Sequence, residues 1–123
     1  VMKKMGFKIK QVSFDKKSAM EFAITMRAEK FKLKDASQLP SMKTIGVRRI
    51  ENKVKNAEFY YLHNRSYEYC VSNVRAEELY NGWLRIRKIS KNMKIDLFDA
   101  SVFGAVAMLE DMESKAKVKN ILD

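Results

Sequence analysis

The stretch MKTIGVRRIENKVKNAEFYYLHNRSYEYCV, residues 42–71, contains the two elements on which the fold depends. Two patterns compete at its start. Apolar residues alternate there as in a strand, whereas Val47, Ile50 and Val54 also share one stripe of a helix. Because three apolar positions fall on a single stripe, we expect a helix over residues 44–54, with a strand as the alternative.

The second half of this stretch predicts a β-hairpin. The segments AEFYYLH and SYEYCVS are rich in aromatic and β-branched residues, which favour strands. Between them lie Asn, Arg and Ser at 64–66, residue types that suit a turn. We therefore expect a hairpin over residues 58–71, with Arg65 near its tip.

Three elements are expected before residue 42. Residues 5–12, MGFKIKQV, alternate apolar side chains with lysines and predict a half-buried strand. A helix over about 16–31 follows, because Ser18 and Glu21 have the spacing of a capping box and apolar residues then recur at helical intervals. The segment KDASQLPSMKT predicts a short helix that ends near Pro40.

The segment RAEELYNGWLRIRKI, residues 75–89, allows two interpretations. Apolar residues from Ala76 to Ile86 share a helical face, which favours a helix. Alternatively, Asn81 and Gly82 make a tight turn before a strand.

The C-terminal part, residues 97–119, predicts a long helix with an apolar seam. The seam residues step by four and three, the spacing of a surface that packs along another helix. This partner is either another part of the chain or a second copy in a homodimer. The seam consists of Phe98, Val102, Ala105, Leu109, Met112 and Ala116.

Composition bounds the class of protein. The chain of 123 residues suits one small α+β domain, and a hydrophobic share of 46% supports a folded core. The longest apolar run, residues 102–109, is too short to cross a bilayer, so no membrane partner is expected. A single cysteine excludes an internal disulfide framework and favours a cytoplasmic location.

Positive charge is concentrated towards the start of the chain. The net charge is +10, and residues 1–55 hold 15 Lys and Arg against 5 Asp and Glu, whereas residues 95–123 hold 3 against 6. A focused positive field attracts polyanions. This asymmetry suggests a polyanion partner, with scattered lysines on an ordinary solvated surface as the alternative.

The expected order from 16 to 72, namely helix, short helix, turn, basic helix and hairpin, resembles a winged helix-turn-helix domain. In that family a small residue in the short helix packs on the next helix and a hydrophobic one closes it, positions that Ala36 and Leu39 match. The resemblance implies that the basic helix enters the major groove of DNA and that residues 58–71 form the wing. Residues 75–123 then form a C-terminal helical part for dimerisation.

The function expected from this resemblance is non-catalytic binding of nucleic acid, duplex DNA before RNA, in a regulatory or architectural role. Lysines and arginines would bind phosphates, while Arg48 or Arg49 would read guanine and Asn52 adenine. No cofactor or metal is expected. The expected contact residues are Lys43, Thr44, Arg48, Arg49, Asn52, Lys53 and Arg65.

Two other functions compete with this one. The basic face would serve equally in an accessory subunit or inhibitor that docks on an acidic protein. A metal-dependent nuclease is the third hypothesis, because Asp96 or Asp99 with Glu113 and Lys115 has the residue types that hold a divalent cation.

Overall fold

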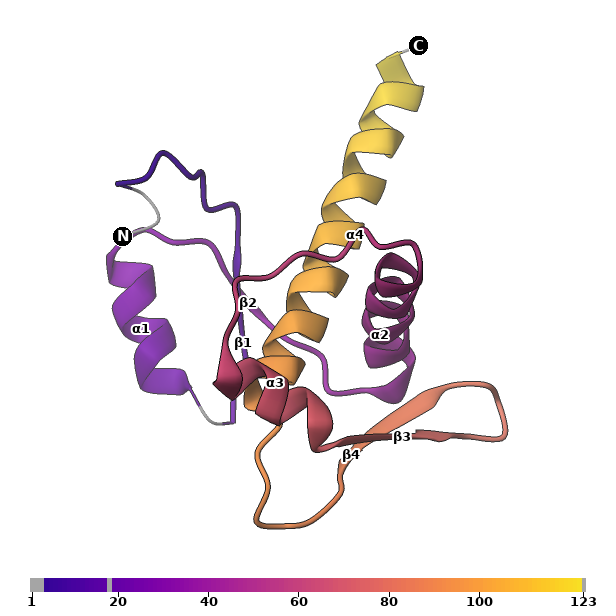
Figure 1. The fold of residues 1–123 in the computed structure, drawn as a ribbon. Helices are drawn as coiled ribbons and strands as arrows, with labels where there is room; N and C mark the ends of the chain where they lie inside the picture. Colours follow the sequence, from indigo (N-terminus) through magenta and orange to yellow (C-terminus); the bar gives the residue numbers. More distant parts are fainter. Residues whose placement is uncertain (1–3, 18, 123) are drawn as a thin grey trace. The chain divides into compact units, whose positions relative to one another are not determined.

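The computed structural model describes residues 4–17 and 19–122 (Figure 1). The chain divides into two compact units, Val1–Ser37 and Gln38–Asp123. Each unit has its own two-stranded sheet. Helices and strands of both units together make an α+β protein, so the predicted fold class is confirmed.

The first unit is a small strand–helix–strand unit. Strand β1 (Val12–Phe14) pairs in parallel with β2 (Leu33–Asp35), and helix α1 (Met20–Ala28) connects them. Parallel strands need such a crossover, because a tight turn reverses the chain and would make the second strand antiparallel to the first. Phe14 and Ala23 are the buried apolar residues among those described in this unit.

Two predictions for the first unit were wrong. Residues 7–11 have no regular structure, and the strand expected over 5–12 instead begins at Val12. The short helix is also absent, because the chain forms β2 and the Ala36 amide then donates to the Phe14 carbonyl. The expected helix over 16–31 is present as α1, and the Ser18 capping position lies outside the described residues.

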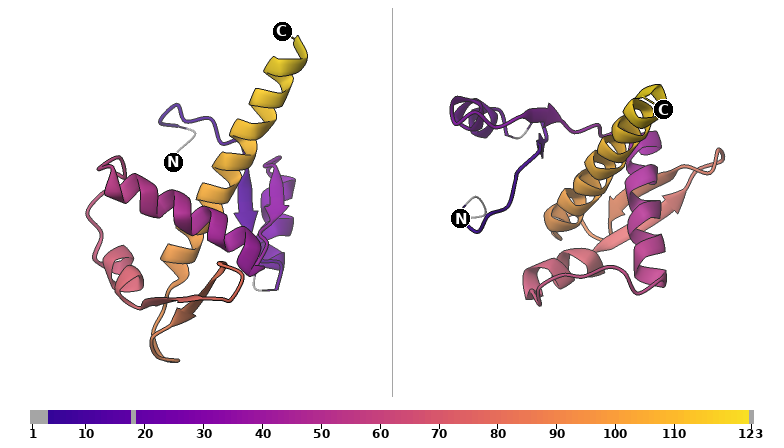
Figure 2. Two further views of the ribbon diagram at one scale, coloured as in Figure 1. Left: turned by 90° about the vertical axis from the view of Figure 1, so that its right-hand side faces the viewer. Right: turned by 90° about the horizontal axis from the view of Figure 1, so that it is seen from above.

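The second unit is built around helix α2 (Pro40–Lys55), which contacts both the long helix α4 (Asp96–Leu122) and strand β4 (Leu84–Lys88). Figures 1 and 2 show that α2 crosses α4 and that β4 runs obliquely across α2. The helix expected over 44–54 is therefore confirmed, and Pro40 occupies its first position, where the missing amide costs no helical hydrogen bond.

The crossing of α2 and α4 depends on Gly46. A Cβ atom at this position would lie 2.7 Å from the Val102 carbonyl oxygen and 2.9 Å from Val102 Cγ1. Val102 is fully buried, and Ala105 is buried one turn later. The two helices approach this closely only because residue 46 has no side chain.

Helix α3 (Arg65–Ser72) occupies residues that were expected to form a hairpin strand. Its start is fixed by Asn64, whose side-chain oxygen accepts a hydrogen bond from the Tyr67 amide at 3.0 Å. Cys70 is buried, and α3 packs on α4. The hairpin predicted over 58–71 was wrong because asparagine at 64 caps a helix instead of starting a turn.

The hairpin of the second unit lies at β3 (Val74–Glu78) and β4, where the sequence favoured a helix. The strands are antiparallel, with Ala76 opposite Ile86. The Gly82 amide donates to the Leu79 carbonyl at 2.9 Å, and Gly82 has a φ of +81°. This is the three-residue loop that ends in a left-handed glycine. The alternative interpretation, with a turn at Asn81 and Gly82, is therefore correct.

Buried Asn73 joins three segments of this unit. Its carbonyl accepts from the Ile89 amide at 2.9 Å, and its side chain donates to the Lys94 carbonyl at 2.9 Å. Its own amide donates to the Cys70 carbonyl at the end of α3. Through its backbone and its side chain, Asn73 thereby joins the end of α3, the end of β4 and the segment that leads into α4.

The seam of the C-terminal helix divides into two parts. Val102 and Ala105 are buried, and this half of α4 packs on α2 and α3 of the same chain. Residues 112–122 are all exposed, Met112 and Ala116 among them, while Phe98 and Leu109 are half-buried. The first half of the seam therefore packs within the chain.

Candidate nucleic-acid interface

The β3–β4 hairpin has two chemically different faces. Side chains alternate between the faces of a strand, so the Val74, Ala76 and Glu78 positions share one face with Leu84 and Ile86. Leu84 is buried and β4 packs on α2, which places this face against the helix. The opposite face carries Arg75, Arg85, Arg87 and Glu77, and we call these four residues the arginine face.

Two arginines lie directly opposite each other on the arginine face. Arg75 pairs across the strands with Arg87, and like charges in this position destabilise a sheet. Glu77 relieves the repulsion in part, because its Oε2 lies 2.9 Å from Arg87 Nε. In residues 4–17 and 19–122, neither Arg75 nor Arg85 has an ion-pair partner. The face therefore has an excess of two positive charges, three arginines against one glutamate.

The arginine face continues into the turn of the hairpin. The Leu79 amide donates to the Trp83 carbonyl at 2.7 Å, so these two residues form the next cross-strand pair beyond Glu77 and Arg85. By alternation, Trp83 lies on the arginine face. Trp83 is 45% exposed, and Tyr80 in the turn is fully exposed. The hairpin therefore presents two aromatic side chains beside its arginines.

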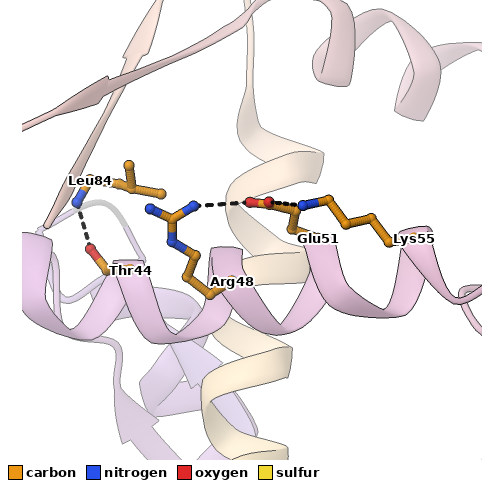
Figure 3. Close-up of polar contacts among 5 residues, drawn as sticks. All are labelled: Thr44, Arg48, Glu51, Lys55 and Leu84. Carbon is orange, nitrogen blue, oxygen red and sulfur yellow. Dashed lines mark hydrogen bonds and ion pairs between the residues drawn. The ribbon is translucent and has the colours of Figure 1, made fainter. Parts of the chain in front are cut away.

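A hydrogen bond between Thr44 and Leu84 fixes the hairpin to α2 (Figure 3). Thr44 Oγ1 accepts from the Leu84 amide at 2.7 Å and donates to the Pro40 carbonyl at 2.6 Å. The amide of β4 nearest the turn is thus satisfied by a helix side chain. Thr44 was predicted as a nucleic-acid contact, and in the structure it positions the hairpin.

Lys43 is turned into the unit. Its Nζ lies 3.3 Å from Asp99 on α4 and 5.6 Å from the ring centre of Phe103, and its side chain is only 12% exposed. A half-buried ion pair with a cation–π contact stabilises the α2–α4 packing. Lys43 therefore lies on the core side of α2 and is largely withdrawn from the surface.

Arg48 belongs to a short ionic row on α2 (Figure 3). Its Nη1 is 3.3 Å from one oxygen of Glu51, and Lys55 Nζ is 2.8 Å from the other. Lys55, and then Arg48, hold the pKa of Glu51 below its ordinary value. The row has a net charge of +1, two cations against one carboxylate, so it attracts an external anion less than the arginine face, whose net charge is +2.

The other predicted contacts lie on two helices: Arg49, Asn52 and Lys53 are within about one turn of each other on α2, and Arg65 is on α3. Lys53 pairs with Glu58 and lowers the pKa of that carboxyl, while Arg49 is half-buried and its Nε has no hydrogen-bond partner among the described residues. Asn52 is exposed on α2, and Arg65 is exposed at the start of α3. The structure thus does not gather the seven predicted contacts into one surface.

The carboxylates of the nuclease hypothesis are also far apart. Asp99 and Glu113 both lie on α4, and 14 helical residues at about 1.5 Å each separate them by roughly 21 Å. Asp99 is paired with Lys43. Within the part of the chain that the structure describes, no three acidic, histidine or cysteine side chains come together as metal ligands.

Sequence reasoning missed the arginine face because residues 75–89 were assigned to a helix. On a helix, Arg75, Arg85 and Arg87 point in different directions. The segment LRIRK alternates apolar and basic residues, and this period of two is the signal that would have found the strand.

Comparisons of the chain with known proteins were made at three levels. No family model, curated protein or solved structure matches it. None of the helices in residues 4–17 and 19–122 has an apolar stretch long enough to cross a membrane.

Proposed function

We propose that the second unit binds nucleic acid without catalysis, and that the arginine face of the β3–β4 hairpin is its contact surface. The observation that carries the proposal is the Arg75–Arg87 pair. Two like charges held opposite each other on an exposed face cost stability unless an anion binds between them. A phosphodiester backbone supplies such anions at regular intervals.

Arginine suits this role better than lysine. Its planar guanidinium donates two parallel hydrogen bonds to one phosphate, so that geometry as well as charge favours the contact. The three arginines of the face lie on a hairpin that Thr44 ties to α2, which limits the conformational entropy lost on binding.

In this proposal the β3–β4 hairpin takes the role of the wing, which the winged-helix resemblance had assigned to residues 58–71. Helix α3 precedes β3 and β4 as a recognition helix precedes its wing, and the exposed Arg65 lies at the start of that helix. Duplex DNA as the preferred target is the prediction from the sequence. A cytoplasmic location stays a prediction. The free thiol of Cys70 is compatible with a reducing compartment.

The proposal is tested by fluorescence anisotropy with labelled duplex DNA, single-stranded DNA and RNA of one length. We expect the Arg75→Ala/Arg85→Ala variant to bind about tenfold or more weakly at low salt. The slope of log affinity against log salt should also fall by about 1.4 to 1.8, since two phosphate contacts are lost.

The matched control is Lys117→Ala/Lys119→Ala, which removes the same charge from exposed positions near the end of α4. Its affinity and salt slope should stay close to those of the wild type. If both double variants weaken binding equally, net charge and not the hairpin determines affinity. If the wild type binds none of the three probes at low salt, the proposal is wrong.

Two other partners predicted from the sequence, an acidic protein and a second copy of the chain, remain predictions. An acidic protein would use the same arginine face, and its binding would compete with nucleic acid. A homodimer would use the exposed residues 112–122 of α4, because the first half of the seam is already buried within the chain.

A further inference from the structure

We propose that the tip of the hairpin binds unpaired bases by stacking, so that the target is single-stranded nucleic acid. The inference rests on the proposed function and specifies its ligand. It departs from the preference for duplex DNA that the sequence suggested. The stacking groups are Trp83, on the arginine face, and Tyr80, in the adjoining turn.

The arrangement of these side chains supports stacking. Trp83 and Leu79 form the cross-strand pair next to Glu77 and Arg85, about 7 Å further along the strands. Cationic and aromatic groups therefore follow each other on one face. Proteins that bind single strands without strong sequence preference use this combination, in which arginines track the phosphates and aromatic rings stack on the bases.

Hydrogen bonds fix the backbone of the turn and leave Tyr80 exposed and Trp83 partly exposed. The Trp83 amide donates to Asn81 Oδ1 at 3.2 Å, and Gly82 supplies the left-handed conformation that closes the turn. Tyr80 is left with its whole side chain in water. Because a tyrosine side chain has only two χ angles, stacking of its ring on a base costs little conformational entropy.

Unpaired bases fit this tip better than a duplex does. In a duplex both faces of each base are covered by its neighbours in the stack, so an aromatic ring finds no free π-surface. A single strand exposes its bases, and the phosphates remain available to Arg75, Arg85 and Arg87. Duplex binding through the arginines alone is the alternative outcome of the test.

Trp83 is the only tryptophan of the chain, which makes its fluorescence a direct reporter. The probes are an oligothymidylate of about 12 nucleotides, a strand of abasic deoxyribose phosphates of the same length, and a duplex. We expect oligothymidylate to quench Trp83 fluorescence and to bind most tightly. The abasic strand should bind more weakly and leave the emission intensity nearly unchanged.

Substitution of Tyr80 tests the same contact without disturbing the strands. Tyr80→Ala should weaken oligothymidylate binding about 10-fold and leave abasic-strand affinity as it is. Tyr60→Ala is the matched control, since Tyr60 is 86% exposed in the segment between α2 and α3, outside the hairpin. Trp83→Phe should retain most of the affinity, because phenylalanine also stacks.

The outcomes separate the two proposals. Equal binding of abasic and base-containing strands, with no effect of Tyr80→Ala, would overturn the stacking inference and leave the arginine face as a phosphate-binding surface. Tighter binding of the duplex would overturn it as well. Failure of all probes to bind would remove both proposals.

Discussion

Gly46→Ala is expected to destabilise the second unit by about 1–3 kcal/mol, although alanine is the better helix former. The added Cβ would lie 2.7 Å from the Val102 carbonyl oxygen, which belongs to the backbone of α4 and cannot rotate away. Val106 Cγ2 at 3.0 Å closes another side of the site. Helix propensity returns only about 1 kcal/mol. Urea unfolding followed by circular dichroism measures the net change.

Gly104→Ala is the matched control for this prediction. Gly104 lies on α4, close along the chain to Val102, and nothing lies within 4 Å of a Cβ built on it. The same substitution should therefore stabilise the unit by up to about 1 kcal/mol through helix propensity alone. Stabilisation by both substitutions would show that α2 and α4 do not cross closely at Gly46.

Arg75→Glu is expected to change stability and binding in opposite directions. A glutamate opposite Arg87 replaces a repulsive cross-strand pair by an attractive one, which should stabilise the hairpin by about 0.2–1 kcal/mol. The same change removes one phosphate contact and places a negative charge on the arginine face. Affinity for nucleic acid should fall more than tenfold at about 50 mM salt.

The measurements are the unfolding midpoint and the anisotropy titration, made on one preparation of each protein. Lys117→Glu is the control, because it reverses the same charge at an exposed position on α4. It should change neither quantity much. A more stable Arg75→Glu variant with undiminished affinity would contradict the role of the arginine face, and a less stable one would contradict the cross-strand register.

Helices that bury an apolar stripe could be predicted from the sequence. The stripe of Val47, Ile50 and Val54 predicted α2, and the seam from Phe98 predicted α4. Periodicity succeeds in these cases because each helix packs on another along several turns. Periodicity could not show that Gly46, an unfavourable residue type inside a helix, is the residue at which the two helices cross.

The hairpins could not be placed in the same way, because local signals have more than one use. Aromatic residues between Phe59 and Tyr69 have high strand propensity, but tertiary packing of Tyr67 and Cys70 selects a helix there. Asparagine at 64 and at 81 suits a helix cap or a turn, and the structure uses one for each purpose. The candidate site was missed because two of its arginines lie on β4, a strand that the sequence analysis had assigned to a helix.

The two halves of helix α4 differ in local stability, although they belong to one continuous helix. Around Val102 its backbone opens only when the second unit opens, so amide protons there should exchange with solvent slowly. From residue 112 to 122 every side chain is exposed, and the last turns are a peptide helix in water. Those amides should exchange orders of magnitude faster, and trypsin should cut after Lys115, Lys117 or Lys119 before any cleavage in α2.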